Sequence, residues 1–189
     1  ELRQWEDESD IVLANSPTHN VGAIVLDNIK KVTHESPMLS LAKCHSAEEV
    51  KQFAKEHTLV GSVKLDGLTC RLIFKDGELI RAESRGNGTI GNIITDHVKQ
   101  FLNVPLHINK KGTYIIDGEA LIKTDDFEEL NKNDEYKTPR NLASGTLGSL
   151  DTSVVKDRKL YWYAWEVVEG DSDNSFYKRL LNAQNLGFD

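Results

Sequence analysis

The feature that most constrains the fold is an alternating segment that ends in a two-residue turn. Apolar side chains occupy every second position from Leu68 to Phe74, which is the period of a strand with one apolar face. Asp76-Gly77 follows, a strong signal for a hairpin, and residues 78–84 form the expected partner strand. Because so short a turn joins strands that run in opposite directions, this segment predicts an antiparallel sheet.

Shorter patterns along the chain predict further helices and strands around this hairpin. Ser46 and Glu49 fit a capping box with Ser46 as the N-cap, so residues 46–57 are expected to be helical. The glycine-rich turn at residues 85–91 is expected to open a helix-like segment that reaches about residue 102. The other expected elements are the end of a helix at 1–6, strands at 114–122 and 159–168, and helices at 125–131 and 175–186. Antiparallel strands with peripheral helices predict the α+β class.

The composition fits one globular domain and argues against two kinds of partner. The 189 residues are 39% hydrophobic, which is enough to bury one core. The 23 basic and 30 acidic residues give a net charge of −7, so this chain alone is a poor clamp for duplex DNA, although one focused contact stays compatible. Without a membrane-span pattern or a signal-peptide pattern, we expect a cytoplasmic protein with no membrane partner. Cys44 and Cys70 lack zinc spacing and are expected to be two buried thiols.

The first motif with chemical potential is Lys64-Leu-Asp-Gly67. The lysine follows Gly61-Ser-Val63 in what reads as an apolar strand, and it lies two residues before Asp66. Burial of a lysine favours the neutral amine, which is a nucleophile. The alternative is a surface lysine beside a turn, because short motifs also occur by accident.

The second motif is the segment Ser84-Arg-Gly-Asn-Gly-Thr-Ile-Gly91. Closely spaced glycines let the backbone approach a phosphate, and Arg85 can add a charged, bidentate contact. The spacing of Gly86, Gly88 and Gly91 matches the dinucleotide-binding string, but no parallel β-α-β unit surrounds it, so that fingerprint is excluded. A flexible exit from the hairpin is the alternative interpretation.

Three further motifs follow. Asp117-Gly-Glu119, at the end of a predicted strand, could bind a divalent cation or a ribose hydroxyl, or could be two solvated charges at a turn. Thr138-Pro-Arg-Asn-Leu-Ala-Ser-Gly145 reads as a polar loop that enters a helix of small residues. In Tyr161-Trp-Tyr-Ala-Trp165, alternate aromatics could stack on a base, whereas core packing is the expectation for most of them.

Taken in this order, the five motifs resemble those of the bacterial-type NAD-dependent DNA ligases, in the nucleotidyltransferase superfamily. Lys64-Leu-Asp-Gly67 is similar to the nucleophile motif of that family, and residues 84–91 are similar to its Thr-Arg-Gly-Asp-Gly-Thr-x-Gly segment. Gly118-Glu119-Ala120 and the Pro139–Gly145 segment resemble two more of its strings. ATP-dependent ligases and capping enzymes share only Lys-x-Asp-Gly, so the flanking strings favour the NAD-dependent family.

The resemblance implies a role for each matching residue. Lys64 would attack the α-phosphate of NAD to form lysyl-AMP, which is passed to the 5′-phosphate of nicked DNA, and Asp66 would support the motif and act in a later step. The resemblance also implies Mg²⁺ as a cofactor, without naming residues that would hold it. The nucleotide pocket would be lined by Ser40, Leu41, Lys64, Arg85, Glu119 and Trp165.

The resemblance also sets expectations for domains and partners. Residues 1–6 would be the tail of an N-terminal helical region, and residues 7–189 an incomplete adenylation domain with the antiparallel-sheet nucleotidyltransferase fold. The partners would be nicked double-stranded DNA and additional ligase domains or a second subunit, in replication and repair. Ser62, Asn87 and Gly148 depart from the family pattern, which has acidic residues at the first two positions and arginine at the third. The alternative is therefore a non-catalytic ligase-like module that binds a partner subunit or DNA.

Overall fold

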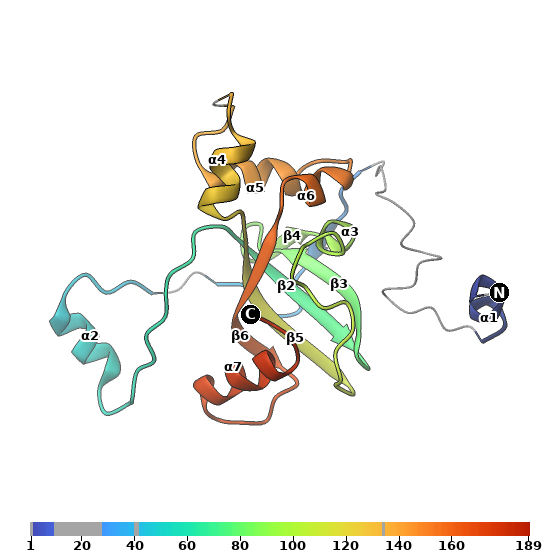
Figure 1. Ribbon diagram of the computed structural model, residues 1–189. Helices are drawn as coiled ribbons and strands as arrows, with labels where there is room; N and C mark the ends of the chain where they lie inside the picture. Colours follow the sequence, from blue (N-terminus) through green and yellow to red (C-terminus); the bar gives the residue numbers. More distant parts are fainter. Residues whose placement is uncertain (1, 10–27, 40–41, 134) are drawn as a thin grey trace.

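A four-stranded antiparallel sheet forms the centre of the molecule (Figure 1). The computed structural model describes residues 2–9, 28–39, 42–133 and 135–189. The strands lie in the order β3-β2-β5-β6. Their bounds are Leu68–Lys75 for β2, Glu78–Ser84 for β3, Thr113–Leu121 for β5 and Tyr161–Glu169 for β6. The antiparallel sheet and the α+β class predicted from the sequence are therefore confirmed.

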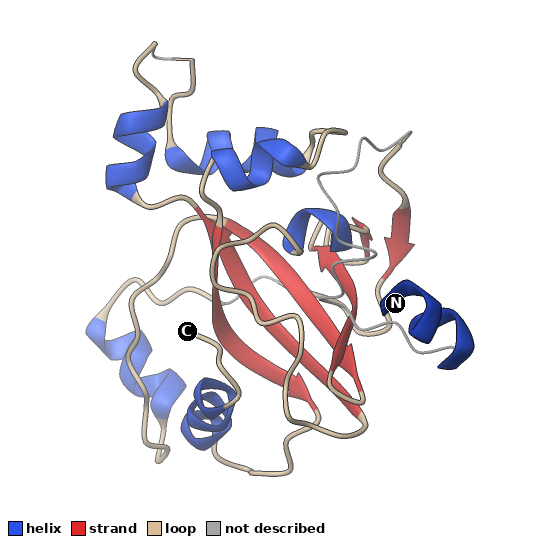
Figure 2. Cartoon of the chain, turned by 45° about the vertical axis from the view of Figure 1, so that its right-hand side comes forward, coloured by secondary structure: helices blue, strands red, loops and turns tan. Residues whose placement is uncertain are grey.

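Helices surround the sheet at its ends. In Figures 1 and 2, α4, α5 and α6 lie at one end of the sheet, and α7 lies toward the other end, where it packs beside β6. No helix in the described part of the chain combines the length and the apolar character needed to cross a membrane. The helices are α1 Leu2–Ser9, α2 Ala47–Ala54, α3 Thr95–Val98, α4 Thr124–Leu130, α5 Pro139–Leu147, α6 Ser153–Asp157 and α7 Phe176–Asn185.

The hairpin between β2 and β3 forms as predicted. Asp76 and Gly77 both have positive φ angles, 50° and 96°, as the type I′ turn between two strands requires. At Gly77 a side chain would also collide, because an added Cβ would lie 2.6 Å from the carbonyl oxygen of Ile108. The turn is thus fixed both by its own conformation and by the neighbouring segment.

The prediction after the glycine-rich turn is wrong in part. Instead of opening a helix, the turn leads into β4, Ile90–Asn92, which pairs with β1, Lys31–Thr33. The only helical residues between 85 and 102 are the single turn of α3. Strands of three residues are too short to show a period in the sequence, so this small sheet was not predicted.

One face of the large sheet carries the core. The apolar positions of β2 at residues 70, 72 and 74 are fully buried, together with Tyr114 and Ile116 of β5. Trp162 of β6 and Phe188 belong to the same cluster, and the ring centroid of Phe188 lies 5.7 Å from that of Trp162. The prediction of one apolar face is therefore confirmed, and the alternate positions of the same strands form an opposite, more polar face, on which Arg71 and Ile73 are also buried.

Residues 42–66 reach away from the sheet (Figure 1), which corrects two predictions. The segment that precedes Lys64 is no strand, and Val63 is 83% exposed. Within this segment α2 has the predicted Ser46 N-cap but buries no side chain, and Phe53 is exposed. Cys44 is also exposed, so only Cys70 is the buried thiol that was expected.

Candidate active site

The Lys64 motif forms a turn that leads into β2. Lys64 is exposed, so the burial expected for this lysine is not found, because the residues before it are not packed in a sheet. Its Nζ contacts the carbonyl oxygen of Leu65 at 3.5 Å, the long limit of a hydrogen bond. Gly67 is buried, and a Cβ there would lie 2.1 Å from the carbonyl oxygen of Ala120. Glycine is therefore required at this position because the turn passes so close to β5.

Glu119 of β5 fastens this turn to the sheet. Its Oε1 accepts a hydrogen bond from the Gly67 amide at 3.1 Å, and its Oε2 accepts one from the Thr69 hydroxyl at 3.1 Å. Thr69 and Glu119 are direct partners in the β2–β5 register, which places both side chains on the polar face. Each carboxylate oxygen can accept a second hydrogen bond, so Glu119 can both hold the turn and meet a hydroxyl group.

The Pro-Arg-Asn motif meets the lysine motif in space. Arg140, in the first turn of α5, donates from Nη1 to Asp66 Oδ1 at 2.9 Å, although the residues are 74 positions apart. Thr138 caps the helix by accepting the Asn141 amide, and proline occupies the first turn, as a helix N-terminus favours. The side chains of Arg140 and Asp66 are 42% and 72% exposed. Such a pair is worth only about 0–1 kcal/mol of stability, so its contribution is to orient Asp66.

The glycine loop, residues 85–91, lies beside the same turn. The Arg85 amide donates to the Thr69 carbonyl at 3.0 Å, which ties the loop to the start of β2. Gly86 and Gly88 have positive φ angles of 55° and 93°. The side-chain oxygen of Asn87 accepts the amides of Thr89 and Ile90 at 3.0 and 2.8 Å. Asn87 therefore supports the turn through an oxygen that an aspartate would also supply.

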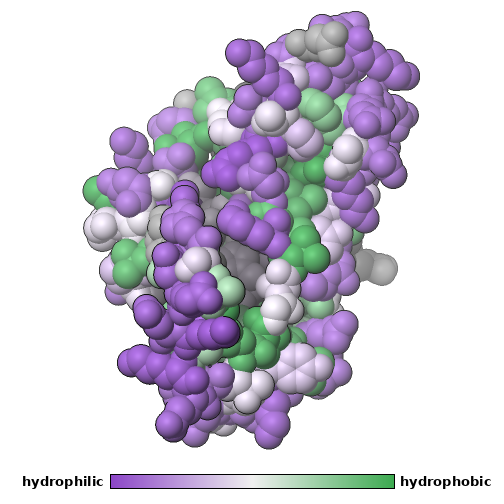
Figure 3. Space-filling view, turned by 90° about the vertical axis from the view of Figure 1, so that its left-hand side faces the viewer, coloured by the Kyte–Doolittle hydropathy of each residue, from purple (hydrophilic) through white to green (hydrophobic). Residues whose placement is uncertain are grey.

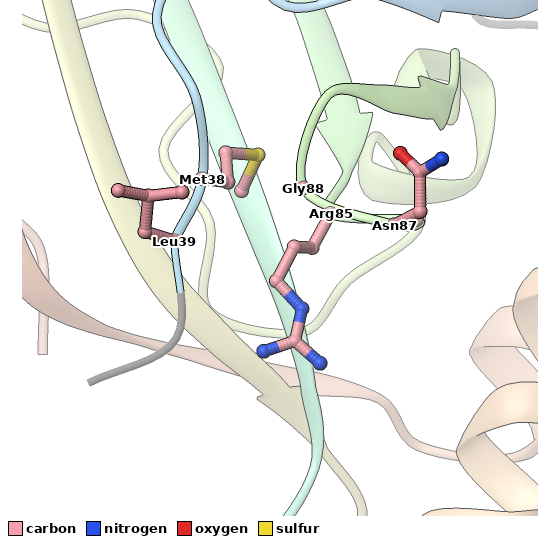
Figure 4. Close-up of a pocket in the computed structure, with 6 residues that line it drawn as sticks. Met38, Leu39, Arg85, Asn87 and Gly88 are labelled. Carbon is pink, nitrogen blue, oxygen red and sulfur yellow. The ribbon is translucent and has the colours of Figure 1, made fainter. Parts of the chain in front are cut away.

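An open pocket of about 350 Å³ lies between this loop and the segment that precedes residue 40. It is lined by Met38, Leu39, Arg85, Gly86, Asn87 and Gly88. In Figure 4, the Met38 side chain points toward the loop, and the Arg85 guanidinium extends from the loop across the sheet. Ser40 and Leu41, which were predicted to line the nucleotide site, lie outside the described residues.

The segment of residues 34–38, which we call the strap, runs along the glycine loop. The amides of His34 and Met38 donate to the carbonyl oxygens of Thr89 and Gly88, each at 2.9 Å. The His34 ring joins the carboxylate of Glu83 at 2.6 Å through Nδ1 and the carbonyl oxygen of Arg85 at 3.1 Å through Nε2. Both side chains of the His34–Glu83 pair are buried. The strap and the loop are therefore one hydrogen-bonded unit.

Charged side chains continue across the polar face of the sheet. Arg71 of β2 makes a two-pronged ion pair with Asp117 of β5, with distances of 2.7 and 2.8 Å. The interpretation of Asp117 and Glu119 as two solvated charges at a turn is wrong, because both lie within β5 and the Asp117 carboxylate is buried and engaged by Arg71. Their binding of a cation or a ribose hydroxyl stays a prediction. Burial, together with the negative charge of Asp117, raises the pKa of Glu166 on β6.

The aromatic motif divides between the two faces of the sheet. Trp162 is buried and packs directly over Gly118, whereas Tyr161, Tyr163 and Trp165 are half-buried. The expectation that most of these rings pack in the core is therefore wrong. Trp165 lies next to a register shift, where β6 pairs irregularly opposite Asp117 and Gly118. Its role as a stacking platform stays a prediction.

The sequence did not single out several residues of this region. Arg140 appeared only inside a longer string, Thr69 and Arg71 lay only at the alternate positions between Leu68 and Phe74, and Met38 was given no role. Arg71 did carry a usable signal, since a charged side chain in the middle of a strand with apolar neighbours needs a buried partner. No group of three or more histidine, cysteine, aspartate or glutamate side chains within the described residues could hold a metal ion.

Comparisons with known proteins agree with this arrangement of motifs. Residues 26–189 match the model of the NAD-dependent DNA ligase adenylation domain. The whole chain aligns with proteins named DNA ligase from Ruminiclostridium cellulolyticum, 39% identical over 197 residues, and from Lachnoclostridium phytofermentans, 39% identical over 198. The relative from Mycoplasmopsis agalactiae is 32% identical over 200 residues, again across the whole chain. The chain spans only 30–31% of the length of these relatives. It belongs to the family of NAD-dependent DNA ligase adenylation domains.

Proposed function

We propose that this chain supplies the lysine and the nucleotide pocket for the adenylation step of an NAD-dependent DNA ligase. The observation that carries the proposal is the convergence of separate motifs on the Lys64 turn. Glu119 holds the amide of Gly67, Arg140 holds Asp66, and the Arg85 amide holds the strand that begins after the turn. Membership of the adenylation-domain family supports the same assignment.

In the proposed step, the neutral amine of Lys64 attacks the α-phosphate of NAD. A phosphorus–nitrogen bond forms, the bond to nicotinamide mononucleotide breaks with its electron pair, and the amine loses a proton, which leaves lysyl-AMP. Lys64 is exposed, so a nucleotide phosphate can reach its amine without any opening of the core. Asp66, held by Arg140, supports the turn and acts in the later transfer to the 5′-phosphate of DNA.

The residues of the pocket fit a nucleotide. The glycine loop brings backbone close to the pocket, and the half-buried Arg85 supplies the charge that a phosphate needs. In this proposal Glu119 accepts a ribose hydroxyl, Trp165 stacks on the base, and Ser40 and Leu41 contribute to nucleotide binding. We propose that Mg²⁺ binds with the phosphates of the nucleotide, since phosphate oxygens commonly complete its coordination.

Beyond this step, the proposal concerns the whole ligase. We assign residues 7–189 to an incomplete adenylation domain of the nucleotidyltransferase fold and residues 1–6 to the tail of an N-terminal helical region. Nick sealing would require additional ligase domains or a second subunit, because the net charge of −7 gives this chain little affinity for DNA phosphates. The complete enzyme would act on nicked double-stranded DNA during replication and repair in the cytoplasm.

A chimeric ligase tests the proposal. The chain would replace the matching 30% of the Ruminiclostridium cellulolyticum relative, and the product would be incubated with NAD and Mg²⁺. We expect a mass increase of one AMP, which Lys64→Arg abolishes because arginine stays protonated and cannot act as a nucleophile. Lys51→Arg, on exposed α2, is the matched control and should leave the adduct unchanged. Intact mass and peptide mapping measure the outcome.

The second candidate function is a non-catalytic module that binds a partner subunit or DNA. It is favoured by the exposed apolar side chains of residues 42–66, of which Phe53 is 65% and Val63 83% exposed. Figure 3 shows the side of the molecule from which residues 42–66 project, and there hydrophilic residues predominate while hydrophobic ones lie in groups between them. A chimera that folds but carries no AMP would overturn the enzymatic proposal and support the non-catalytic module. An AMP adduct that persists in the Lys64→Arg variant would refute the assignment of Lys64 as the nucleophile.

A further inference from the structure

Arg71 makes more contacts than an ion pair requires. Its Nε and Nη2 donate to the two carboxylate oxygens of Asp117, and the side chains of both residues are only 4% and 5% exposed. A buried ion pair is often no more stabilising than apolar residues of similar volume, because both charges must lose their water. Stability alone therefore gives no reason for this pair, and the rest of the guanidinium points to another role.

The remaining nitrogen of Arg71 holds the strap. Nη1 donates to both the carbonyl oxygen and the hydroxyl oxygen of Ser36, each at 2.8 Å. Asp117 fixes the plane of the guanidinium, so the direction of Nη1 toward the strap is set by the sheet itself. Only arginine offers donors in this rigid fork, whereas the single ammonium of a lysine, with three N–H donors, cannot serve four acceptor oxygens in these positions.

Ser36 lies midway between the two residues that join the strap to the glycine loop. On either side of it, the amides of His34 and Met38 bond to the loop, and Met38 with Leu39 forms the pocket wall opposite Arg85. The strap is thus held along one edge by the loop and at its centre by the sheet. A shift at Ser36 would move the Met38 wall relative to the Arg85 side of the pocket.

We propose that Arg71, oriented by Asp117, is a positioning residue that fixes the strap and thereby the wall of the nucleotide pocket. This inference rests on the proposed function of that pocket, since it assigns the wall to nucleotide binding. Neither residue contacts the pocket, which is lined by other side chains. Their contribution is to have the wall in place before the nucleotide arrives, so that binding does not have to order it.

Two variants separate this role from general stability. In the double variant Arg71→Asp with Asp117→Arg, the opposite charges remain paired, but position 71 has no donor for Ser36. In Arg71→Lys, the charge stays and the fork is lost. The control is Arg158→Lys, whose residue donates to Thr146 and lies outside the strap and the pocket.

Hydrogen exchange and AMP binding, both measured on the 189-residue chain, provide the readouts. In both Arg71 variants we expect the Met38 amide to exchange at least about tenfold faster and AMP to bind about tenfold more weakly. A change of this size is what the loss of a hydrogen bond made by a charged group produces. The amides of Leu72 and Ile116, inside the sheet, should keep their protection and report that the variant is folded. If the double variant loses that protection, Arg71→Lys decides the result.

The outcomes distinguish the inference from the function on which it rests. If wild type binds AMP and the Arg71 variants bind it equally well, or if the Met38 amide keeps its protection, the inference is overturned. If wild type does not bind AMP, the nucleotide pocket itself is wrongly assigned. In that case the exchange rate of Met38 still decides whether Arg71 holds the strap.

Discussion

Substitution of Gly118 by alanine tests how tightly the site is built on the core. A Cβ at this position would lie 2.3 Å from Cζ2 and 2.4 Å from Cε2 of Trp162, and 2.4 Å from the carbonyl oxygen of Tyr163. The indole has no room to retreat, because Trp162 is 1% exposed and its Nε1 donates to the Cys70 carbonyl. Overpacking of a rigid core costs about 1–3 kcal/mol and occasionally more, so we expect a loss near the upper end, about 3 kcal/mol.

Thermal and urea unfolding of the variant measure this loss. For a domain of this size, about 3 kcal/mol corresponds to a fall in Tm of roughly 6–12 °C. Gly61→Ala is the matched control, because nothing lies within 4 Å of a Cβ at that position, and its Tm should stay within about 2 °C of wild type.

A double-mutant cycle identifies the cause. In Trp162→Phe the two indole atoms nearest the new Cβ are removed, so Gly118→Ala should cost less in that background, by at least about 1 kcal/mol. Equal costs in both backgrounds would show that the indole is not the obstacle. A Gly118→Ala variant with the same Tm as wild type would refute the argument from packing altogether.

Two further predictions concern buried groups. Burial, and to a lesser extent the negative charge of Asp171, raises the pKa of Tyr114 to about 12, whereas the usual pKa of tyrosine in an unfolded chain is about 10. The contribution of this shift to stability is therefore complete below about pH 10 and is lost as the pH rises to about 12. Tyr114→Phe should remove this part of the decline in urea midpoint between pH 9 and 12, at little cost near pH 7, because the hydroxyl has no hydrogen-bond partner within the described residues. Burial, with the nearby charges of Glu119 and Asp117, also raises the pKa of the Cys70 thiol, whereas Cys44 is exposed. A thiol reagent should therefore modify one cysteine rapidly in the native protein and two in urea. The Cys44→Ser variant should lack the rapid phase of modification in the native protein. Two rapidly modified thiols in native wild type would contradict the burial of Cys70.

Features that depend on neighbouring residues could be predicted from the sequence. The alternation in β2, the Asp76-Gly77 turn and the Ser46 cap each arise from residues within a few positions of one another. The apolar run before Lys64 shows where such reasoning fails. A short apolar segment has the same pattern whether it is a buried strand or an exposed extended stretch, and only the packing around it decides between them.

The contacts that build the site could not be predicted in this way. Gly67 and Glu119 are 52 positions apart, and Ser36 and Arg71 are 35 apart, so no local period relates them. The order of the motifs along the chain identified the family, but not which side chains meet. Their meeting follows from the β2–β5 register, which places Thr69 beside Glu119, and from the path of the strap over that face.

The three departures from the family pattern have different weights once their surroundings are known. Asn87 accepts the same kind of backbone amides that an aspartate would accept, so the turn it supports keeps its shape. Ser62 and Gly148 are exposed, and Gly148 follows α5 as its C-cap. At exposed positions a charged side chain contributes little to folding, so its absence removes a possible contact with a ligand rather than support for the fold. The departure within the glycine loop is therefore compatible with the proposed adenylation step, whereas the other two would change only the proposed contacts with nucleotide and DNA.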